Sequence, residues 1–434
     1  MNKRSLFRTF LSIFSTNIFV IVLVVAGGII LPRLLSPNAL GKLNALTALA
    51  AIVYSFTFLG MRSSLLLHLG KNTFEKQKII SALGWIYMLS VILSTLALLF
   101  FFFFLSADRF SLAVILLVCL INPVEFLVSY LQGSLLASGK IGYYNRLMWI
   151  PKMIYLFAIL LLVGLSGLHV QGALLAIILS SLITLFIILK ISHVGFPGIR
   201  LRPVPLKVIR SLTGSGIMYA LAFLVTRLNH KVDILLLKRM DDLAEVGYYT
   251  LGANVAESLW QVPIAVGVVL MTRSATTLDQ KPVTRQVCSS LRISLLVVAA
   301  AAIVLFAVAP YLVPFLFGER YTPAVPVIRT ILPGILFFVV LKILNSQFVG
   351  TGKPHLIAMA LIPALFLNII LNLLLIPPYG GTGAAVATDL SYFAGSLVLV
   401  LVYSRTFGIR IKEIFRYRKS DFDFINRLMY FNRD

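Results

Sequence analysis

The sequence predicts an all-α, polytopic membrane protein with about twelve membrane-spanning helices in two parallel six-helix repeats. Hydrophobic residues make up 59% of the 434 residues and charged residues only 12%, about half the charged share of a soluble domain. The mean hydropathy is +0.98. Sequence patterns of the first half also recur in the second half in the same order. This combination is typical of secondary transporters, whose substrate site lies between the repeats.

Three pairs of sequence patterns indicate the duplication. LPRLLSPNALG, residues 31–41, is matched by LLKRMDDLAEVG, residues 236–247, with an arginine eight positions before a glycine in both copies, 206 residues apart. LLASGK, which ends at Lys140, is matched by FVGTGK 213 residues later, and HVQGALLA is matched by GGTGAAVA 211 residues later. The chain is therefore expected to be a tandem duplication with small insertions.

Apolar runs of about twenty residues, the length at which a helix crosses the hydrocarbon core, define the spans in order. They cover residues 10–31, 43–67, 79–105, 111–137, 144–166, 171–191, 209–236, 244–272, 286–317, 324–349, 354–376 and 383–404. The first run follows basic residues, as in a signal peptide. It is too long for one and lacks a small-residue cleavage site, so we expect it to remain as a membrane helix.

The domain boundaries follow from these runs and from one Pro/Gly-rich basic segment between the repeats. We expect an N-terminal six-helix bundle at residues 1–195, a cytoplasmic connector at 196–207, a C-terminal six-helix bundle at 208–405 and a basic amphipathic cytoplasmic tail at 406–434. The tail interleaves aromatic and aliphatic residues with Arg and Lys. This pattern favours an amphipathic helix on the membrane surface, with a disordered basic tail as the alternative.

Composition and spacing exclude several kinds of chemistry. The loops are too short for a nucleotide-binding domain, and the Gly-Lys pairs at residues 139–140 and 352–353 lack the rest of a phosphate-binding loop. Two cysteines and five scattered histidines offer no metal-ligand spacing. We therefore predict that the protein is not an enzyme, has no catalytic residues and uses no metal or cofactor.

The distribution of lysine and arginine predicts the orientation, because positive charge is retained on the cytoplasmic side. With the amino terminus inside, the termini and even-numbered loops hold 26 of these residues, and the opposite loops hold 6. Both termini are therefore expected in the cytoplasm. The net charge of +23 is explained by this orientation and by contact with anionic membrane lipids, so no nucleic-acid partner is expected.

Ionisable side chains within the spans are the candidate functional residues, since each costs about 2.5 to 3.5 kcal/mol on insertion scales and requires a partner, a watery cavity or a helix end. Excess basic charge among them suits an anionic substrate. The basic residues are Arg62, Lys152, Arg227, Lys231, Arg329 and Lys342, and the acidic residues are Glu125, Asp233, Glu257 and Asp389.

Arg62 and Arg273 are related by the repeat, because they are 211 residues apart and each precedes a serine. Two guanidiniums at the inner mouth of a cavity would hold phosphate oxygens bidentately. The alternative is that each arginine only snorkels from a helix end to the membrane surface.

TRLNHKVD, residues 226–233, is the densest polar stretch within a span. On a helix Arg227 and Lys231 are one turn apart and would repel each other, which an anion in a cavity would relieve. We therefore expect both to contact substrate. Asp233 is expected to neutralise a helix terminus, and the alternative for Lys231 is simple pairing with such an acid.

The acids Glu125 and Glu257 have two open roles. Either carries a coupling proton or cation, or forms structural ion pairs with a buried basic residue such as Arg62, Lys152 or Lys342. Asp389 lies among small residues and is expected to be a polar packing position. Lys152 and Lys342 complete a predicted substrate-binding set with Arg62, Arg227, Lys231 and Arg273.

These residues resemble the bacterial polysaccharide and oligosaccharide flippases of the Wzx type, in the superfamily that includes lipid II flippases and multidrug and toxic compound extrusion transporters. The resemblance covers nearly the whole chain. It is carried in order by ILPRLLSPNALGKLNAL, VDILLLKRMDDLAEVGYYTLGANV, GERYTPAVPVIRTILPG, FVGTGKP and NIILNLLLIPPYGGTGAAVATDLSY.

The resemblance implies a V-shaped pair of bundles in the bacterial cytoplasmic (inner) membrane that alternates between inward-open and outward-open states. The implied cargo is an undecaprenyl-pyrophosphate-linked oligosaccharide, an anionic lipid-linked glycan moved to the outer leaflet for O-antigen, capsule or exopolysaccharide synthesis. A polysaccharide polymerase and a chain-length regulator are the implied partners.

Two alternatives stay open. A cation-coupled multidrug antiporter of the same fold would by resemblance carry an acid in its amino-terminal bundle, often in the first helix, where this chain has none. A non-transporting scaffold of a glycan synthase complex would be expected to have lost its intramembrane charges, which this chain retains.

Overall fold

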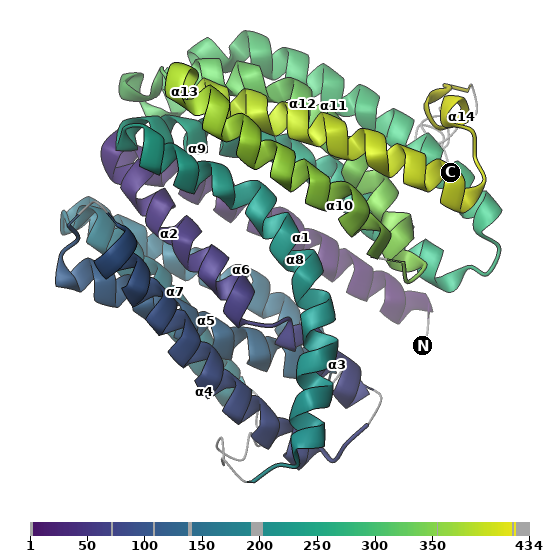
Figure 1. Ribbon diagram of the computed structural model, residues 1–434, viewed down its shortest axis with the longest axis horizontal. Helices are drawn as coiled ribbons and strands as arrows, with labels where there is room; N and C mark the ends of the chain where they lie inside the picture. Colours follow the sequence, from purple (N-terminus) through teal and green to yellow (C-terminus); the bar gives the residue numbers. More distant parts are fainter. Residues whose placement is uncertain are drawn as a thin grey trace. The chain divides into compact units, whose positions relative to one another are not determined.

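The computed structural model describes residues 3–70, 73–106, 109–137, 141–191, 203–353, 355–418 and 421. Within these ranges the chain is helical, and no strand occurs (Figure 1). The chain forms two compact units, Met1–Arg227 and Leu228–Asp434. The predicted all-α class is confirmed.

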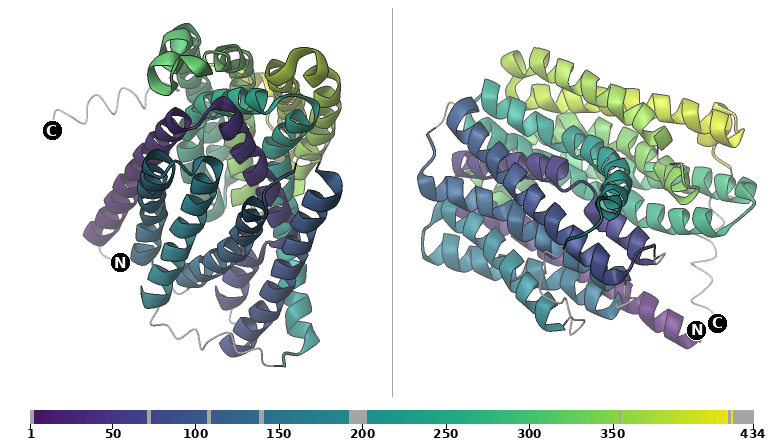
Figure 2. Two further views of the ribbon diagram at one scale, coloured as in Figure 1. Left: turned by 90° about the vertical axis from the view of Figure 1, so that its left-hand side faces the viewer. Right: turned by 60° about the horizontal axis from the view of Figure 1, so that its bottom comes forward.

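Within its described residues, the N-terminal unit contains seven α-helices and the first part of an eighth. They are α1 (Lys3–Leu34), α2 (Pro37–Thr57), α3 (Met61–Gly70), α4 (Lys76–Phe100) with the π-helical turn η1 (Phe101–Leu105), α5 (Leu112–Ala137), α6 (Ile141–Ile159) with the π-helical turn η2 (Leu160–Leu165), α7 (His169–Ile191) and α8 (Leu206–Met240). Helix α7 packs against both α5 and α6, and α6 packs against α1 (Figure 2).

The C-terminal unit is built around one central helix. After α8 come α9 (Leu243–Glu257), η3 (Ser258–Trp260), α10 (Gln261–Thr276), α11 (Gln280–Phe317), η4 (Glu319–Tyr321), α12 (Ala324–Gly350), α13 (His355–Phe407) and α14 (Ile411–Phe415). Helix α12 packs against α9, α10, α11 and α13 and is the most buried of the candidate membrane spans in the described chain.

Helix α13 is two helices in sequence, divided at Gly380, whose φ of 53° and ψ of −133° are not helical. Pro377 and Pro378 precede the break, where the missing backbone donors weaken a continuous helix. The Gly381 N–H that opens the second half donates to Glu245 Oε2 of α9 at 3.1 Å. The break therefore forms the hairpin that the sequence predicts between the last two spans.

Helices occupy all twelve predicted spans. Nine helices in the described ranges are long and apolar enough to cross a membrane, with the two halves of α13 counted as one. Helix α8 is not among these nine, and the apolar part of α1, Phe19–Leu34, is shorter than a full span. The protein is a multi-pass membrane protein. The count of twelve membrane spans stays a prediction.

The repeated sequence patterns mark equivalent structural positions. In the first pair, Ser36 caps α2 by accepting the Ala39 N–H at 3.3 Å, and Pro37 follows at the first helical position. The second copy ends α8 and starts α9, with Asp242 at the capping position. In both copies the pattern marks the place where one helix ends and the next helix begins.

Gly172 and Gly383 are equivalent glycines that allow close packing of a hairpin. A Cβ at Gly172 would lie 2.7 Å from the Leu162 carbonyl oxygen, and a Cβ at Gly383 would collide with the Leu375 carbonyl oxygen. Only glycine permits such an approach of two backbones. The two repeats therefore share this close backbone packing as well as their sequence pattern.

The second span of each repeat is broken in the middle, which the continuous apolar runs did not predict. In the first repeat α2 ends at Thr57 and α3 begins at Met61, with positive φ at Leu59 and Gly60. In the second repeat the 3₁₀ turn η3 separates α9 from α10. Discontinuous helices of this kind line the sites of many transporters.

The boundary between the two compact units lies inside α8, at Arg227. Most of the connector expected at residues 196–207 lies outside the described residues, so the expected domain bounds stay a prediction. The first part of α8 is held by α3, because the Ser64 hydroxyl donates to the Leu212 carbonyl oxygen at 2.8 Å. His68 Nε2 also lies 3.2 Å from Ser215 Oγ. The beginning of α8 thus packs as part of the N-terminal unit.

Candidate functional site

A cavity of about 650 Å³ lies within the N-terminal unit, between α2, α3, α5, α7 and α8. Nine of the sixteen residues that line it have polar side chains, although the helices around it are apolar. The polar residues that line it are Thr47, Tyr54, Ser55, Arg62, Ser63, Asn122, Glu125, Ser129 and Gln132. Polar groups at membrane depth typically mark a substrate or ion pathway.

Arg62 reaches this cavity because of the break between α2 and α3. The break starts a new helix at Met61, so Arg62 occupies its first turn. Gly133 of α5 makes room for the arginine stem, since a Cβ at that position would lie 3.3 Å from Arg62 Cγ. A guanidinium placed on a short, separately started helix is well suited to binding an anion.

Glu125 lines the same cavity from α5. Its Oε1 accepts a hydrogen bond from the Ser181 hydroxyl of α7 at 2.5 Å. One turn earlier, Asn122 Nδ2 donates to the Ala50 carbonyl oxygen at 3.0 Å and to Ser94 Oγ at 2.8 Å. These contacts tie α2, α4, α5 and α7 together, and they fix the position of the carboxylate.

Aromatic rings form another part of the wall. Tyr54 and Phe58 line the cavity and stack with ring centroids 4.8 Å apart. Tyr54 also stacks on Phe126 at 4.9 Å, and its hydroxyl lies 2.9 Å from Ser129 Oγ. The cavity therefore combines one cation, one carboxylate, several neutral hydrogen-bonding groups and flat apolar surfaces.

The C-terminal unit contains a separate charged cluster around Glu257, the last residue of α9 before the break at η3. The charges of Lys231 on α8 and Lys342 on α12 both act on this carboxylate. Lys342 Nζ also lies 4.7 Å above the Phe338 ring, which stacks on Trp260 at 3.8 Å. Three residues that the sequence singled out are thus brought together by three helices.

The prediction that Asp233 neutralises a helix terminus is wrong. Asp233 is 2% exposed and lies two turns before the end of α8. Its carboxylate accepts hydrogen bonds of 2.8 Å from Tyr249, Asn372 and Thr388, which belong to α9 and to both halves of α13. A buried carboxylate that accepts hydrogen bonds from three neutral donors on other helices is a structural crosslink.

Asp389 lies where α13 packs closely on α12. A Cβ added at Gly334 would collide with Asp389 Oδ1, so only glycine fits there. Groups of three or more His, Cys, Asp or Glu side chains suited to a metal ion are absent from the described residues.

The remaining predicted site residues are not gathered in one place by the described structure. Arg273 is exposed in the last turn of α10, and Lys152 is exposed on α6. The side chain of Arg227 lies outside the described residues. Arg329 Nε donates to the Phe306 carbonyl oxygen at 3.1 Å, with the guanidinium over the Phe306 ring.

The neutral residues of both sites do not stand out in the sequence as its charged residues do. In the cavity these are Tyr54, Asn122 and Gln132, and around Asp233 they are Tyr249, Asn368, Asn372 and Thr388. Asparagines at positions 368 and 372 are one helical turn apart in an otherwise apolar run. That spacing places both amides on one face and was the available signal.

Comparison with known proteins places the chain among glycan-related membrane proteins. The model of a family described as "polysaccharide biosynthesis protein" matches residues 30–326. A probable low-salt glycan biosynthesis flippase of Haloferax volcanii is 27% identical over 179 residues, 38% of this chain and 38% of that protein. An uncharacterized membrane protein of Methanocaldococcus jannaschii is 26% identical over 191 residues, 43% of this chain and 38% of that protein. The matched part thus spans well under half of these relatives.

Solved structures share the fold at low sequence identity. The lipid II flippase MurJ in an inward closed conformation aligns with a TM-score of 0.75 and 16% identity, covering 96% of this chain and 95% of that one. A MATE transporter of Vibrio cholerae aligns with a TM-score of 0.61 and 14% identity, covering 95% and 98%. The chain therefore shares the fold of these two proteins, which are named as a flippase and a transporter.

Proposed function

Because the chain belongs to the polysaccharide biosynthesis protein family, we propose that it is a flippase that moves a lipid-linked oligosaccharide across the membrane by alternating access. The finer proposal is an undecaprenyl-pyrophosphate-linked repeat unit, carried from the cytoplasmic to the outer leaflet of a bacterial inner membrane. Its product would serve O-antigen, capsule or exopolysaccharide synthesis. Both termini would be cytoplasmic, and a polymerase and a chain-length regulator would be the downstream partners.

The cavity of the N-terminal unit is the observation that carries this proposal. A glycan headgroup needs a site that exchanges hydrogen bonds with hydroxyl groups and packs against the apolar faces of sugar rings. Asn122, Ser129 and Gln132 supply the first kind of contact, and Tyr54 and Phe58 supply the second. Arg62 adds a cation for the phosphate that joins sugar to lipid.

The other basic residues of the predicted set enter the same proposal with less structural support. Lys231 and Lys342 already have a counter-charge in Glu257, so an anionic cargo would compete with that carboxylate. Arg227, Arg273 and Lys152 would contact the cargo at other stages of transport. Glu125 and Glu257 remain the proposed coupling residues, because each is a carboxylate within a predicted span.

A multidrug antiporter is the second candidate, because MATE transporters share the fold. Helix α1 contains no acidic residue, and the carboxylate of the cavity, Glu125, shares it with the cation Arg62 and several neutral hydrogen-bonding groups. A hydrogen-bonding wall of this kind favours a sugar over a lipophilic drug.

Purified protein in liposomes tests the proposal directly. A fluorescent polyprenyl-pyrophosphate glycan is placed in both leaflets, and a membrane-impermeant quencher reports how fast the inner pool becomes accessible. We expect the protein to accelerate this exchange and Arg62→Ala to remove most of the acceleration. Exchange equal to that of protein-free liposomes, together with extrusion of lipophilic cations, would instead establish the antiporter.

The natural substrate and the direction of transport need a cellular experiment. Depletion of the protein should cause one lipid-linked glycan to accumulate in the cytoplasmic leaflet. Cysteine labelling from outside should modify a cysteine placed at position 242 and spare one placed at position 430. The reverse labelling would overturn the proposed orientation.

A further inference from the structure

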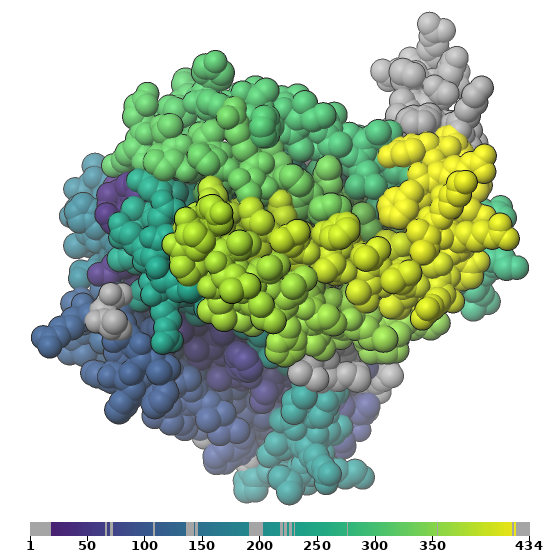
Figure 3. Space-filling model, turned by 45° about the horizontal axis from the view of Figure 1, so that its top comes forward, coloured from purple at the N-terminus to yellow at the C-terminus, as the bar shows by residue number. Residues whose placement is uncertain are grey.

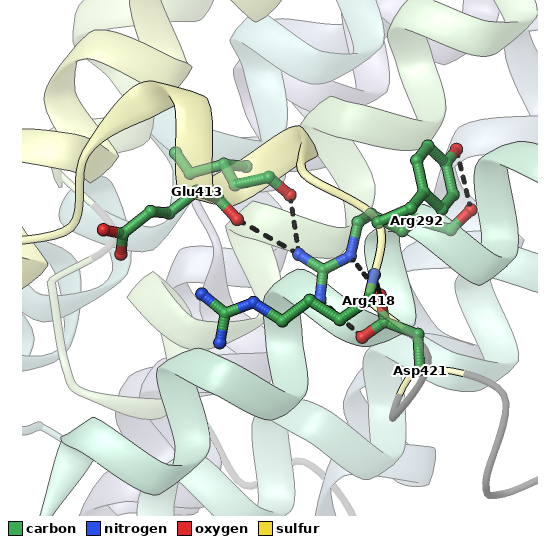
Figure 4. Close-up of polar contacts among 6 residues, drawn as sticks. Arg292, Glu413, Arg418 and Asp421 are labelled. Carbon is green, nitrogen blue, oxygen red and sulfur yellow. Dashed lines mark hydrogen bonds and ion pairs between the residues drawn. The ribbon is translucent and has the colours of Figure 1, made fainter.

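Arg292 of α11 is a buried cation held by the C-terminal segment of the chain (Figure 4). It is 4% exposed, and Asp421 is 3% exposed. The guanidinium donates from Nε to Asp421 Oδ2 at 2.7 Å and from Nη2 to Oδ1 at 2.6 Å. Its Nη1 donates to the carbonyl oxygens of Glu413 and Ile414 at 3.2 and 3.0 Å. We call this set of contacts the clasp.

The clasp gives a buried charge what it requires, namely a bidentate counter-ion and further hydrogen bonds. Two more bonds reinforce it, because the Arg418 N–H donates to Asp421 Oδ2 at 2.8 Å and the Tyr417 hydroxyl donates to the Arg292 carbonyl oxygen at 3.4 Å. Ile414 of α14 is fully buried. Residues 410–418 are therefore fixed on the C-terminal unit.

The outer surface of this fixed segment is basic and apolar at once. Ile411, Phe415 and Tyr417 are 41%, 37% and 47% exposed. The four basic residues of the segment are also exposed, and its one acid, Glu413, is half-buried and joins the clasp through its backbone carbonyl oxygen. The basic residues are Arg410, Lys412, Arg416 and Arg418.

The segment also directly follows a helix that is long and apolar enough to span a membrane. Helix α13, which is of membrane-spanning length, ends at Phe407, and Gly408 turns the chain with a φ of 63°. Ile411 follows four residues after that end, so it lies within about 14 Å of it even if the chain is fully extended. The end of α13 and the segment form one continuous surface, drawn in yellow in Figure 3.

We propose that residues 410–418 are a binding platform for anionic phospholipid headgroups and that the clasp between Arg292 and Asp421 holds this platform in position. Lysine and arginine beside a membrane bind anionic headgroups, and aromatic rings insert at the level of those headgroups. Phosphatidylglycerol and related lipids supply the complementary negative charge. The platform would be independent of the cargo site in the N-terminal unit.

A polarity-sensitive fluorophore on Phe415→Cys tests the platform in the full-length protein, since Cys119 and Cys288 are buried. The protein is placed in liposomes of phosphatidylcholine alone or with phosphatidylglycerol. We expect phosphatidylglycerol to shift the emission to shorter wavelength and to reduce quenching by aqueous acrylamide, a neutral quencher, about threefold, with part of the effect lost in about 0.5 M salt.

Three variants distinguish the contribution of the clasp from the contribution of the basic charges. Asp421→Asn should abolish the effect of phosphatidylglycerol although every basic residue remains. Arg410→Gln/Arg416→Gln/Arg418→Gln should abolish it although the clasp remains. Lys281→Gln/Arg285→Gln/Lys353→Gln removes the same charge from exposed positions of the same unit and should leave the effect intact.

Equal quenching in both kinds of liposome would overturn the platform. A probe that is buried in both would show instead that protein covers the segment. A full lipid effect in Asp421→Asn would overturn the role of the clasp. Elution of each variant as a monodisperse species in size-exclusion chromatography confirms that it has folded, and the triple arginine variant keeps the test decisive if Asp421→Asn does not fold.

Discussion

Arg62 and Glu125 line the same cavity, although they lie on different helices, α3 and α5. The arginine reaches the cavity because α2 breaks before it, and the glutamate is fixed there by Ser181. A cation and a carboxylate at one wall allow the cavity to bind a cargo that is both charged and rich in hydroxyl groups.

Arg62→Ala should reduce the rate of glycolipid exchange about 10- to 100-fold, because a lost hydrogen bond to a charged group corresponds to about 1.5 to 3 kcal/mol. Arg62→Lys should retain part of the activity, since it keeps the charge but not the bidentate geometry. The measurement is the liposome exchange rate at equal protein density. Arg146→Ala, an exposed arginine of the same unit, is the control, and equal rates for both alanine variants would remove Arg62 from the site.

Glu257→Gln should lower the thermal unfolding temperature, because it leaves Lys231 and Lys342 without the counter-charge that acts on them. The Glu257→Gln/Lys342→Met double variant should regain part of that loss, with a coupling energy of about 0.5 to 3 kcal/mol. Thermal unfolding of the four proteins in detergent gives the cycle. Strict additivity of the two single effects would show that Glu257 and Lys342 are not coupled.

Tyr249→Phe should destabilise the C-terminal unit by about 1 to 3 kcal/mol, because it removes one donor from the buried carboxylate of Asp233. Asn372→Leu should do the same through a second donor. Denaturant unfolding of the purified protein measures both. Tyr379→Phe removes a hydroxyl from an exposed tyrosine and should leave the stability unchanged. An equal loss of stability in this control would show that the contacts of Asp233 contribute nothing specific.

The clasp should open only in strong acid. Burial raises the pKa of Asp421, but hydrogen bonds from Arg292, the Arg418 N–H and Ser289 outweigh it and lower the pKa to about 2. A depressed pKa stabilises the folded clasp above the unfolded value of about 3.9, and the contribution is lost as the pH falls toward 2. The Phe415→Cys probe should therefore be unchanged from pH 7 to pH 5 and become water-accessible near pH 2 to 3. Release between pH 5 and pH 7 would contradict this ion pair.

The sequence predicted most of the helices because hydrophobic length is a strong signal in a membrane protein. It also singled out Arg62, Glu125, Lys231, Glu257 and Lys342 as candidates, because a charge in an apolar run is conspicuous. The breaks in the second span of each repeat were not predicted, because both halves of each span are apolar and form one continuous apolar sequence. Local turns such as those at Leu59 and η3 depend on packing that hydropathy does not report.

The role of Asp233 was mispredicted for a related reason. Its partners Tyr249, Asn372 and Thr388 are distant in sequence and are brought to it by α9 and α13. Without their positions, proximity in sequence to Lys231 and His230 was the only basis for assigning a partner.

The hydrogen bond from the Gly381 N–H to Glu245 spans 136 residues of sequence and has a consequence for biogenesis. The amide that opens the second half of α13 finds this acceptor only when α9, synthesised much earlier, already lies beside it. The last hairpin of the chain can therefore enter the membrane early but acquires its final geometry only against a preassembled template. Newly synthesised chains that lack the Glu245 carboxylate should insert into the membrane normally but should reach their final fold slowly.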